Sequence, residues 1–343
     1  MATDTADPST SEPPPTAPVT PGRRLQNLLH ANPIVGPLAV LALAILAFSL
    51  VNPRFLAAAN LGLVLQQVTV IATLALGQTL VILTAGIDLA VGAIAVFASM
   101  LMAGAAHTLG VPGPVALILG ILAGTAMGAF NGWLVTVVRL PPFIVTLGTL
   151  SVFFSLNAVV SHGETIRGAE MPPIMTATGD TAFRIGAFGV TWGSLIMLAL
   201  FVVFSYSLSS TAWGRHVYAT GDDLEAARLA GIRTGRVLLS VYLVAGVIYG
   251  IGAWVLMGRL AAASPNIGAE YNLNSITAVV IGGTSLFGGR GLVVGTLVGA
   301  LIVGVFQNGL QLAGVDVVWQ GTAIGLLVLV AVAVDQRIRK VKR

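Results

Sequence analysis

The sequence predicts an all-α, polytopic integral membrane protein with about ten transmembrane helices and both termini in the cytoplasm. Of its 343 residues, 56% are hydrophobic and only 9% are charged, and the mean hydropathy is +0.93. A soluble domain cannot bury that much apolar surface. Apolar stretches of roughly 20 residues recur along the chain, and each is expected to be a helix because lipid offers the backbone no hydrogen-bond partners.

The N-terminal segment, by contrast, is polar. Its first 22 residues, MATDTADPSTSEPPPTAPVTPG, are rich in Pro and Thr and carry too few apolar groups to offset the entropy of ordering. We predict a disordered cytoplasmic tail over residues 1–30. No small-residue cleavage site of the expected kind follows the first apolar run, so we expect no cleaved signal peptide.

The transmembrane domain is predicted over residues 31–335, followed by a basic cytoplasmic tail at 336–343. Gly, Pro or charged residues separate its apolar stretches. The eighth stretch is short and polar at its start, so a broken or tilted helix is an alternative there. The candidate spans are 33–51, 60–83, 89–109, 113–137, 142–160, 190–209, 236–258, 270–287, 291–312 and 317–334.

Cationic residues divide unevenly between the two sides that ten spans create. Of the 17 Lys and Arg residues, 13 fall on the side of the N-terminus and four on the other side. Cytoplasmic segments of membrane proteins carry this excess, which favours ten spans with both ends inside and explains the net charge of +4 without nucleic acid. The inside set is Arg23, Arg24, Arg139, Arg215, Arg228, Arg233, Arg236, Arg290, Arg337, Arg339, Lys340, Lys342 and Arg343, and the outside set is Arg54, Arg167, Arg184 and Arg259.

Two loops are long enough to have structure of their own. The predicted extracytoplasmic loop, residues 161–189, has nearly balanced charges and a Pro172-Pro173 pair, so its backbone is expected to be rich in turns. It either caps the helix bundle or contacts an extracytoplasmic partner.

The predicted cytoplasmic loop, residues 211–235, contains signals for a short helix. Asp222 can cap a helix whose third residue, Glu225, reaches back in a capping box, and Gly231 can end it in the left-handed conformation. Such a helix is too short to span a bilayer. It is either a well-capped connector or a docking element that a soluble partner pushes. The candidate coupling residues are Asp222, Asp223, Leu224, Glu225, Ala226, Ala227, Arg228, Leu229 and Gly231.

Glycines at four-residue spacing predict close helix packing. A ridge without side chains lets two backbones approach where no hydrophobic effect separates protein from lipid. We expect internal packing rather than a dimer seam. One ridge comprises Gly120, Gly124, Gly128 and Gly132, and a second comprises Gly291, Gly295 and Gly299.

Polar residues within the spans form two stripes. Each stripe falls on one face of a helix, and neutral hydroxyls and amides suit a neutral polyhydroxylated solute better than an ion. Alternatively, each group satisfies a neighbouring helix, a bond of roughly 1–2 kcal/mol in model peptides. The first stripe is Thr146, Thr149, Phe153 and Asn157, and the second is Gln66, Thr69 and Thr73, continued by Gly77.

Asp88, in GIDLAVG at 86–92, is the one carboxylate expected at membrane depth. A charge there costs roughly 2.5–3.5 kcal/mol on insertion scales, so it requires a reason. Capping of the following span is favoured over a proton relay, because no second acid or histidine accompanies it.

Several activities are excluded by missing residues. The chain has no Cys, so thiolate metal sites and thiol catalysis are excluded, and its four His form no ligand pair. It also lacks a phosphate-binding G-x-x-x-x-G-K-[ST] loop, an H-E-x-x-H pair and a G-x-S-x-G elbow. We predict neither cofactor nor metal, and any nucleotide-driven motor must be a separate chain.

Four collinear segments resemble the permease subunits of bacterial ABC importers for ribose, xylose, arabinose, galactosides and related sugars. They are GQTLVILT at 77–84 leading into GIDLAVG, RLPPFIVTLGTLSV at 139–152, GRHVYATGDDLEAARLAGI at 214–232 and AVVIGGTSLFGGRG at 278–291. The resemblance covers about residues 30–340. Within the third segment, Glu225-Ala226-Ala227 and Gly231 match the EAA-x-x-x-G core of permease coupling segments, although the usual following Leu-Pro is absent.

The resemblance implies a non-enzymatic transport subunit in the bacterial inner membrane, in contact with lipid. Two copies would form the pathway for ribose or a related monosaccharide, each docking a cytoplasmic ATPase through the short helix, and an extracytoplasmic sugar-binding protein would deliver the substrate. A proton-coupled secondary carrier, a passive channel and an ABC permease for branched-chain amino acids remain as alternatives.

Overall fold

The computed structural model describes residues 34–316, 318–326 and 329 and is predominantly helical, as the sequence predicts. The predicted tails at 1–30 and 336–343, and part of the tenth candidate span, lie outside the described residues. The helices are α2 (Val35–Val51), α3 (Ala58–Leu83), α4 (Val91–His107), α5 (Gly113–Thr136), α6 (Pro142–Ser161), α7 (Trp192–Ser210), α8 (Ala212–Asp222), α9 (Leu224–Leu229), α10 (Thr234–Leu260), α11 (Ala269–Ile281) and α12 (Val293–Leu312).

Six helices of the described chain are long and apolar enough to cross a membrane: α3, α5, α6, α7, α10 and α12. The apolar helices α2 and α4 have 17 residues each. The predicted eighth span at 270–287 is instead the 13-residue helix α11, which is about 20 Å long and shorter than the hydrocarbon core of about 30 Å. It ends before Gly282-Gly283, and Gly283 has a left-handed φ of 89°.

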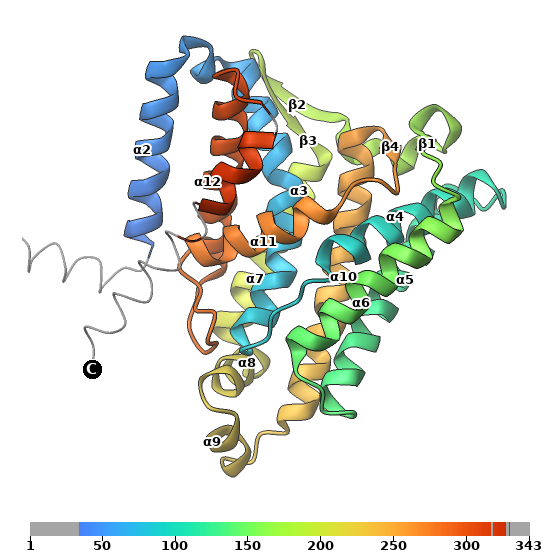
Figure 1. The fold of residues 1–343 in the computed structure, drawn as a ribbon, viewed down its shortest axis with the longest axis vertical. Coiled ribbons are helices and arrows are strands. Elements are labelled where there is room, and N and C mark those ends of the chain that lie inside the picture. Colours follow the sequence, from blue (N-terminus) through green and yellow to red (C-terminus); the bar gives the residue numbers. More distant parts are fainter. Residues whose placement is uncertain (1–33, 317, 327–328, 330–343) are drawn as a thin grey trace, which may run out of the picture.

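Helix α3 forms the centre of the bundle, and every residue from Val68 to Leu83 is buried. A helix that is hydrophobic all round belongs in the interior of a bundle. It packs against α7, α10, α11 and α12 (Figure 1). Helix α2 packs on α12, whereas α6 covers α4 and α5. The surface positions of the outer helices carry large apolar side chains, including Leu43 on α2 and Val202 on α7, which are 65% and 70% exposed.

Short strands occur within an otherwise helical chain, which the all-α prediction does not include. The hairpin of β2 (Thr181–Ile185) and β3 (Phe188–Thr191) turns at Gly186, whose φ is 61°. β1 (Ile166–Arg167) pairs antiparallel with β4 (Ala262–Ala263), directly after α10. The predicted loop at 161–189 is thus ordered by pairing with backbone far away in sequence, which local turn signals cannot reveal. The described chain also contains four short 3₁₀ turns: η1 (Pro53–Leu56), η2 (Gly168–Glu170), η3 (Pro173–Met175) and η4 (Ala177–Gly179).

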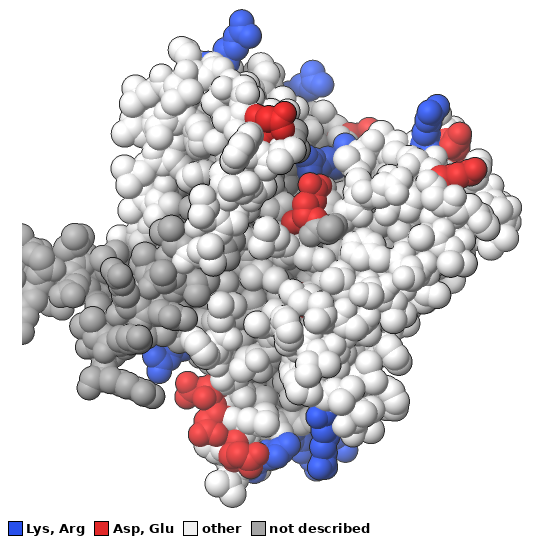
Figure 2. Space-filling view, in the orientation of Figure 1, with Lys and Arg blue, Asp and Glu red and all other residues white. Residues whose placement is uncertain are grey.

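The charged side chains gather at the two ends of the molecule. Figure 2 shows one group over α8 and α9 and another around the strands at the opposite end, with a broad uncharged band between them on this face. An uncharged band with exposed apolar side chains is the surface that a lipid bilayer requires.

Candidate functional site

The short helix α9 is the first candidate site, and it is capped by Asp223. The Asp223 Oδ1 atom accepts hydrogen bonds from the backbone N–H groups of Glu225, at 2.9 Å, and Ala226, at 3.0 Å. The prediction that Asp222 is the cap was wrong, because Asp222 is the last residue of α8 and Asp223 is the extended residue between the two helices.

Glu225 does not complete a capping box. Its carboxylate instead accepts a hydrogen bond from Arg228 at 2.9 Å, within an ion pair whose side chains are about half to three-quarters exposed, so it contributes little to stability. Gly231 has a φ of 85°, and the Ile232 N–H donates to the Ala227 carbonyl at 3.0 Å. This bond closes α9 with a left-handed C-terminal motif.

The surface of α9 leaves apolar side chains uncovered. Leu229 is 89% exposed and Leu224 is 37% exposed, whereas Ala227 is buried against the bundle. Of the candidate coupling residues, all but Ala227 are exposed. A rigid helix with exposed leucines at the end of the molecule is a surface that a partner protein can bind.

Helix α8 connects α9 to the bundle through contacts that only glycine permits. A Cβ atom on Gly221 would collide with the Leu83 carbonyl, and one on Gly288 would lie 2.5 Å from the Gly221 carbonyl. The Gly289 N–H donates to the Leu83 carbonyl at 3.0 Å. The end of α8, the loop before α12 and the end of α3 are therefore in direct backbone contact, and we call this contact the glycine junction.

A tyrosine strengthens the glycine junction. The Tyr218 hydroxyl on α8 donates to the Gly291 carbonyl at 2.8 Å. Burial raises the pKa of the Tyr218 phenol above its usual value, so this group stays protonated and remains a donor at neutral pH.

Asp88 lies in the segment between α3 and α4 and is 1% exposed. It is not the N-cap of α4, as the sequence led us to expect, because Ala90 holds that position. Its Oδ1 atom accepts from the Ala90 N–H at 2.8 Å. The first turn of α4 is capped from another helix, since Asn272 on α11 accepts from the Gly92 N–H at 2.6 Å. Sequence reasoning missed Asn272, because its partner lies 180 residues away.

The stripe on α6 faces the interior of the bundle. Thr146, Thr149, Phe153 and Asn157 are all at most 5% exposed. The Thr146 hydroxyl donates to the Ile87 carbonyl at 2.9 Å, and the Asn157 amide donates to the Pro265 carbonyl at 3.3 Å. In this conformation the stripe connects α6 to two irregular segments of the chain, at 84–90 and 261–268.

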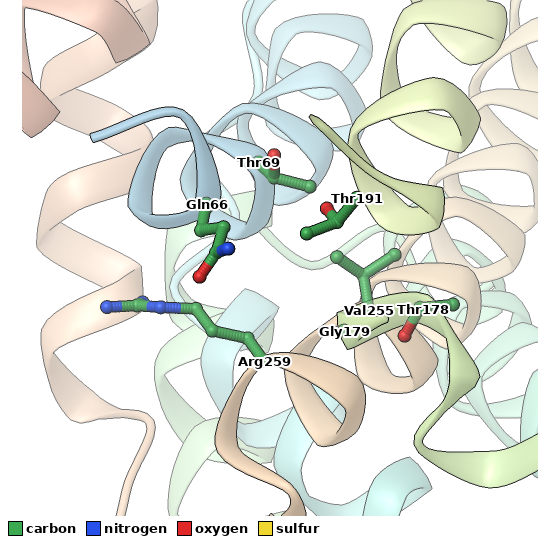
Figure 3. A pocket seen from close by; sticks show the side chains of 7 residues that line it. All are labelled: Gln66, Thr69, Thr178, Gly179, Thr191, Val255 and Arg259. Carbon is green, nitrogen blue, oxygen red and sulfur yellow. The ribbon is translucent and has the colours of Figure 1, made fainter. Parts of the chain in front are cut away.

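The stripe on α3 leads into two adjoining pockets at the end opposite α9. Gln66 and Thr69 line a narrow pocket of about 30 Å³, whereas Thr73 is fully buried and donates to the Thr69 carbonyl. Gln66 also lines a wider cavity of about 340 Å³. Sequence reasoning did not identify Arg259, which lines both pockets and faces the same space as Gln66 in Figure 3. The wider cavity is lined by Asn60, Leu63, Gln66, Gln67, Arg259, Asn308, Gln311 and Leu312.

Hydroxyl groups close the inner side of the narrow pocket. Thr69 Oγ1 lies 2.9 Å from Ser194 Oγ, which lies 3.0 Å from Thr191 Oγ1. The Thr178 hydroxyl donates to the Trp254 carbonyl at 2.9 Å. The first two contacts join α3 to the start of α7, and the third joins η4 to α10. We call the two adjoining pockets the mouth.

The first glycine ridge lies between helices. Cβ atoms on Gly124, Gly128 and Gly132 would meet the backbone or side chains of α10, with that on Gly128 2.5 Å from the Tyr242 carbonyl. Gly120 faces Met102 on α4 instead.

The second glycine ridge is shorter than predicted. Gly295 and Gly299 on α12 pack directly on the backbone of Gly282 and Ala278. Gly291 is not part of this ridge, because it lies in the loop before α12, with a φ of 158° and Thr284 beside it.

Comparisons with known proteins identify the family. A family model described as the permease component of a branched-chain amino acid transport system matches residues 60–332. The fructose import permease protein FrcC of Rhizobium meliloti is 47% identical over 323 residues, which cover 93% of this chain and 89% of FrcC. No solved structure matches the chain.

Further relatives are also named as permease proteins for sugars. The ribose import permease protein RbsC of Bacillus subtilis is 40% identical, covering 91% of this chain and 96% of its own. The D-allose transport system permease protein AlsC of Escherichia coli is 32% identical, covering 89% and 92%. With six apolar helices able to span a membrane among its described residues, the chain belongs to the family of bacterial ABC importer permeases and is an inner-membrane transport subunit rather than an enzyme.

Proposed function

We propose that this chain forms the translocation pathway for ribose or a related monosaccharide in an ATP-driven importer. Its relatives are named for the import of fructose, ribose and allose. The observation that carries the proposal is the placement of α9, with its exposed leucines, at one end and of a mouth lined by several neutral amides and Arg259 at the other.

The proposed assembly contains two copies of the chain, a cytoplasmic ATPase for each and an extracytoplasmic sugar-binding protein. Each copy would cross the lipid bilayer ten times, with α11 and the segments beside it together making the eighth crossing, and with both termini in the cytoplasm. The uneven division of cationic residues supports this orientation. The charged groups at the two ends in Figure 2 lie where a membrane-spanning protein would meet water.

The ATPase would bind α9 and its neighbours, residues 222–231. Its exposed leucines provide apolar contact, and the Asp223 cap and Gly231 terminator keep the helix rigid. Closure of two motors would bring the two copies of α9 together and move the glycine junction, which is in backbone contact with α3.

The sugar would pass between the mouth on α3 and the stripe on α6. That stripe is buried in this conformation, so the proposal requires that it become accessible in another conformation. Because the chain has no Cys, single cysteines at Thr149 and Asn157 can be tested with membrane-impermeant thiol reagents. Labelling should depend on whether ATP is present, and equal inaccessibility in all states would argue against this path.

The first test of the function is purification of the tagged chain in mild detergent, followed by mass spectrometry of the associated proteins and ATP-driven uptake in proteoliposomes. We expect an ATPase in equal amount and uptake of D-ribose or D-fructose. Uptake of leucine without sugar uptake would favour a branched-chain amino acid permease, which the family description includes. Purification of the chain alone, with uptake that uncouplers abolish, would overturn the proposal.

A further inference from the structure

We propose that the permease itself recognises the sugar, through a binding subsite in the wider cavity in which Arg259 is the specificity-determining residue. The inference rests on the proposed function and assigns to the permease a selectivity that delivery by a binding protein does not require. The cavity of about 340 Å³ lies within the range of small-molecule pockets, roughly 300–1,000 Å³.

Arg259 has unused hydrogen-bonding capacity. Its guanidinium makes one long hydrogen bond, 3.5 Å to the Tyr271 hydroxyl, although it carries five N–H donors in a fixed fork. Within the described part of the chain, one ion pair is formed, between Arg228 and Glu225. Arg259 therefore has no carboxylate partner among the described residues. A half-buried guanidinium with free donors is ready to bind the vicinal hydroxyl oxygens of a sugar.

The amide side chains around the cavity are of two kinds: some are hydrogen-bonded to each other, and others lack a hydrogen-bond partner. Asn60 and Asn308 are paired reciprocally, at 2.9 and 3.0 Å, and hold α3 against α12. Gln67 Oε1, in contrast, is buried without a hydrogen-bond partner among the described residues. A buried acceptor without a partner is costly, and a sugar hydroxyl is a donor as well as an acceptor. Gln67 also lines the cavity, so a rotation of its side chain would present this acceptor to a polyol that Arg259 binds.

The position of Arg259 suits a selective constriction. Gln66 and Arg259 line both the wide cavity and the narrow pocket, so both side chains would contact a solute that moved from the cavity into the narrow pocket. A cation near the end of α10 is also favoured by the helix dipole. Figure 3 shows that the Arg259 side chain extends from α10 into the space beside Gln66. The described residues that line the cavity include no aromatic side chain, which predicts weak binding that permits release.

The test uses the full chain in lipid nanodiscs, without its binding protein, and saturation-transfer NMR with D-fructose, D-ribose, D-allose and D-gluconate. We expect a signal from a neutral sugar that Arg259→Gln weakens about tenfold or more, as expected for losing hydrogen bonds to a charged group. Arg259→Lys should recover part of it, because Lys keeps the charge but loses the fork. The matched control Arg184→Gln, at an exposed arginine on β2, should bind as the unmodified chain does.

The subsite would be overturned if no neutral sugar binds the unmodified chain, or if the Arg259→Gln variant binds the sugar as well as the unmodified chain does. A signal from D-gluconate alone would also overturn it, by assigning the cavity to sugar acids. Gln67→Leu is a second variant, and both variants must retain the thermal unfolding midpoint of the unmodified chain. Uptake by the complete importer distinguishes the two proposals. If ATP-driven sugar uptake is intact but the binding tests fail, the subsite is ruled out and the proposed import function stands.

Discussion

At the scale of single residues, two adjacent aspartates have different roles. Asp222 and Asp223 are both exposed, and both are good capping residues. Only the Asp223 side chain accepts hydrogen bonds from the first turn of α9. Which aspartate caps α9 depends on where α8 ends. Because α8 ends at Asp222, Asp223 is the extended residue that precedes α9.

Asp223→Ala should therefore weaken α9 by about 1 kcal/mol, the usual effect of losing a cap. We expect backbone amide hydrogen exchange at Glu225 and Ala226 to become several-fold faster, with reduced ATPase binding and unchanged membrane insertion. Asp222→Ala is the matched control and should leave exchange unchanged. Equal effects of the two substitutions would show that charge, rather than capping, matters here.

Glycines on different helices also differ in what surrounds them. A Cβ atom on Gly128 would lie 2.5 Å from the Tyr242 carbonyl and 2.8 Å from the Gly246 Cα atom, whereas one on Gly148 of α6 would meet nothing within 4 Å. Gly128→Ala is expected to destabilise the protein by about 1–3 kcal/mol because the backbones must separate. Gly148→Ala should be neutral or slightly stabilising. Thermal unfolding in detergent measures both, and similar midpoints would contradict close packing of α5 on α10.

At the scale of elements, the glycine junction is the contact through which α8 and α9 reach the centre of the bundle. Gly221, Gly288 and Leu83 belong to three segments far apart in sequence, and their backbones touch. Such an arrangement transmits displacement because no flexible side chain separates the parts. It also connects α9, the proposed ATPase-docking helix, to α3, the helix that carries Gln66 and Thr69 at its other end.

Gly221→Ala is expected to abolish most ATP-driven uptake while the chain still inserts and still binds its ATPase. The added methyl group would collide with the Leu83 carbonyl, so α8 must move away from α3. Gly235→Ala, where a Cβ atom would meet nothing within 4 Å, is the control. Normal uptake by the Gly221 variant would mean that motion reaches the pathway by another route.

The sequence predicts some elements better than others, for physical reasons. Long apolar stretches such as α3 and α10 are confirmed as helices, because their hydropathy alone requires them to be helical in lipid. Helix α8 was not foreseen, since its pattern is that of a polar surface segment. The pairing of β1 with β4 and the capping of α4 by Asn272 depend on contacts across about 100 to 180 residues. The sequence indicates only that Arg259 is a charged residue on the outside of the membrane. Its place in a cavity cannot be predicted, because that cavity forms only when α3, α10 and α12 pack together.

At the scale of the whole molecule, the two charged ends and the uncharged band between them in Figure 2 indicate the axis along which the molecule would cross a membrane. We call this band, with its exposed apolar side chains, the apolar band. The hydrophobic side chains of α2 and α7 are exposed in this band, where lipid or a second copy of the chain would cover them. The mouth and α9 lie at opposite ends, so solute recognition and motor docking are expected on opposite sides of the bilayer.

Single cysteines test this orientation directly, because the native chain has none. In intact spheroplasts, a membrane-impermeant maleimide should label Arg184→Cys but not Glu225→Cys, which should react only after the membrane is opened. Leu43→Cys, in the apolar band, should resist the reagent in both conditions although its side chain position is 65% exposed in the isolated protein. The reverse labelling of the two end positions would invert the chain in the membrane and place α9 beyond reach of any cytoplasmic ATPase. Labelling of all three positions from outside would show that the apolar band does not lie in lipid.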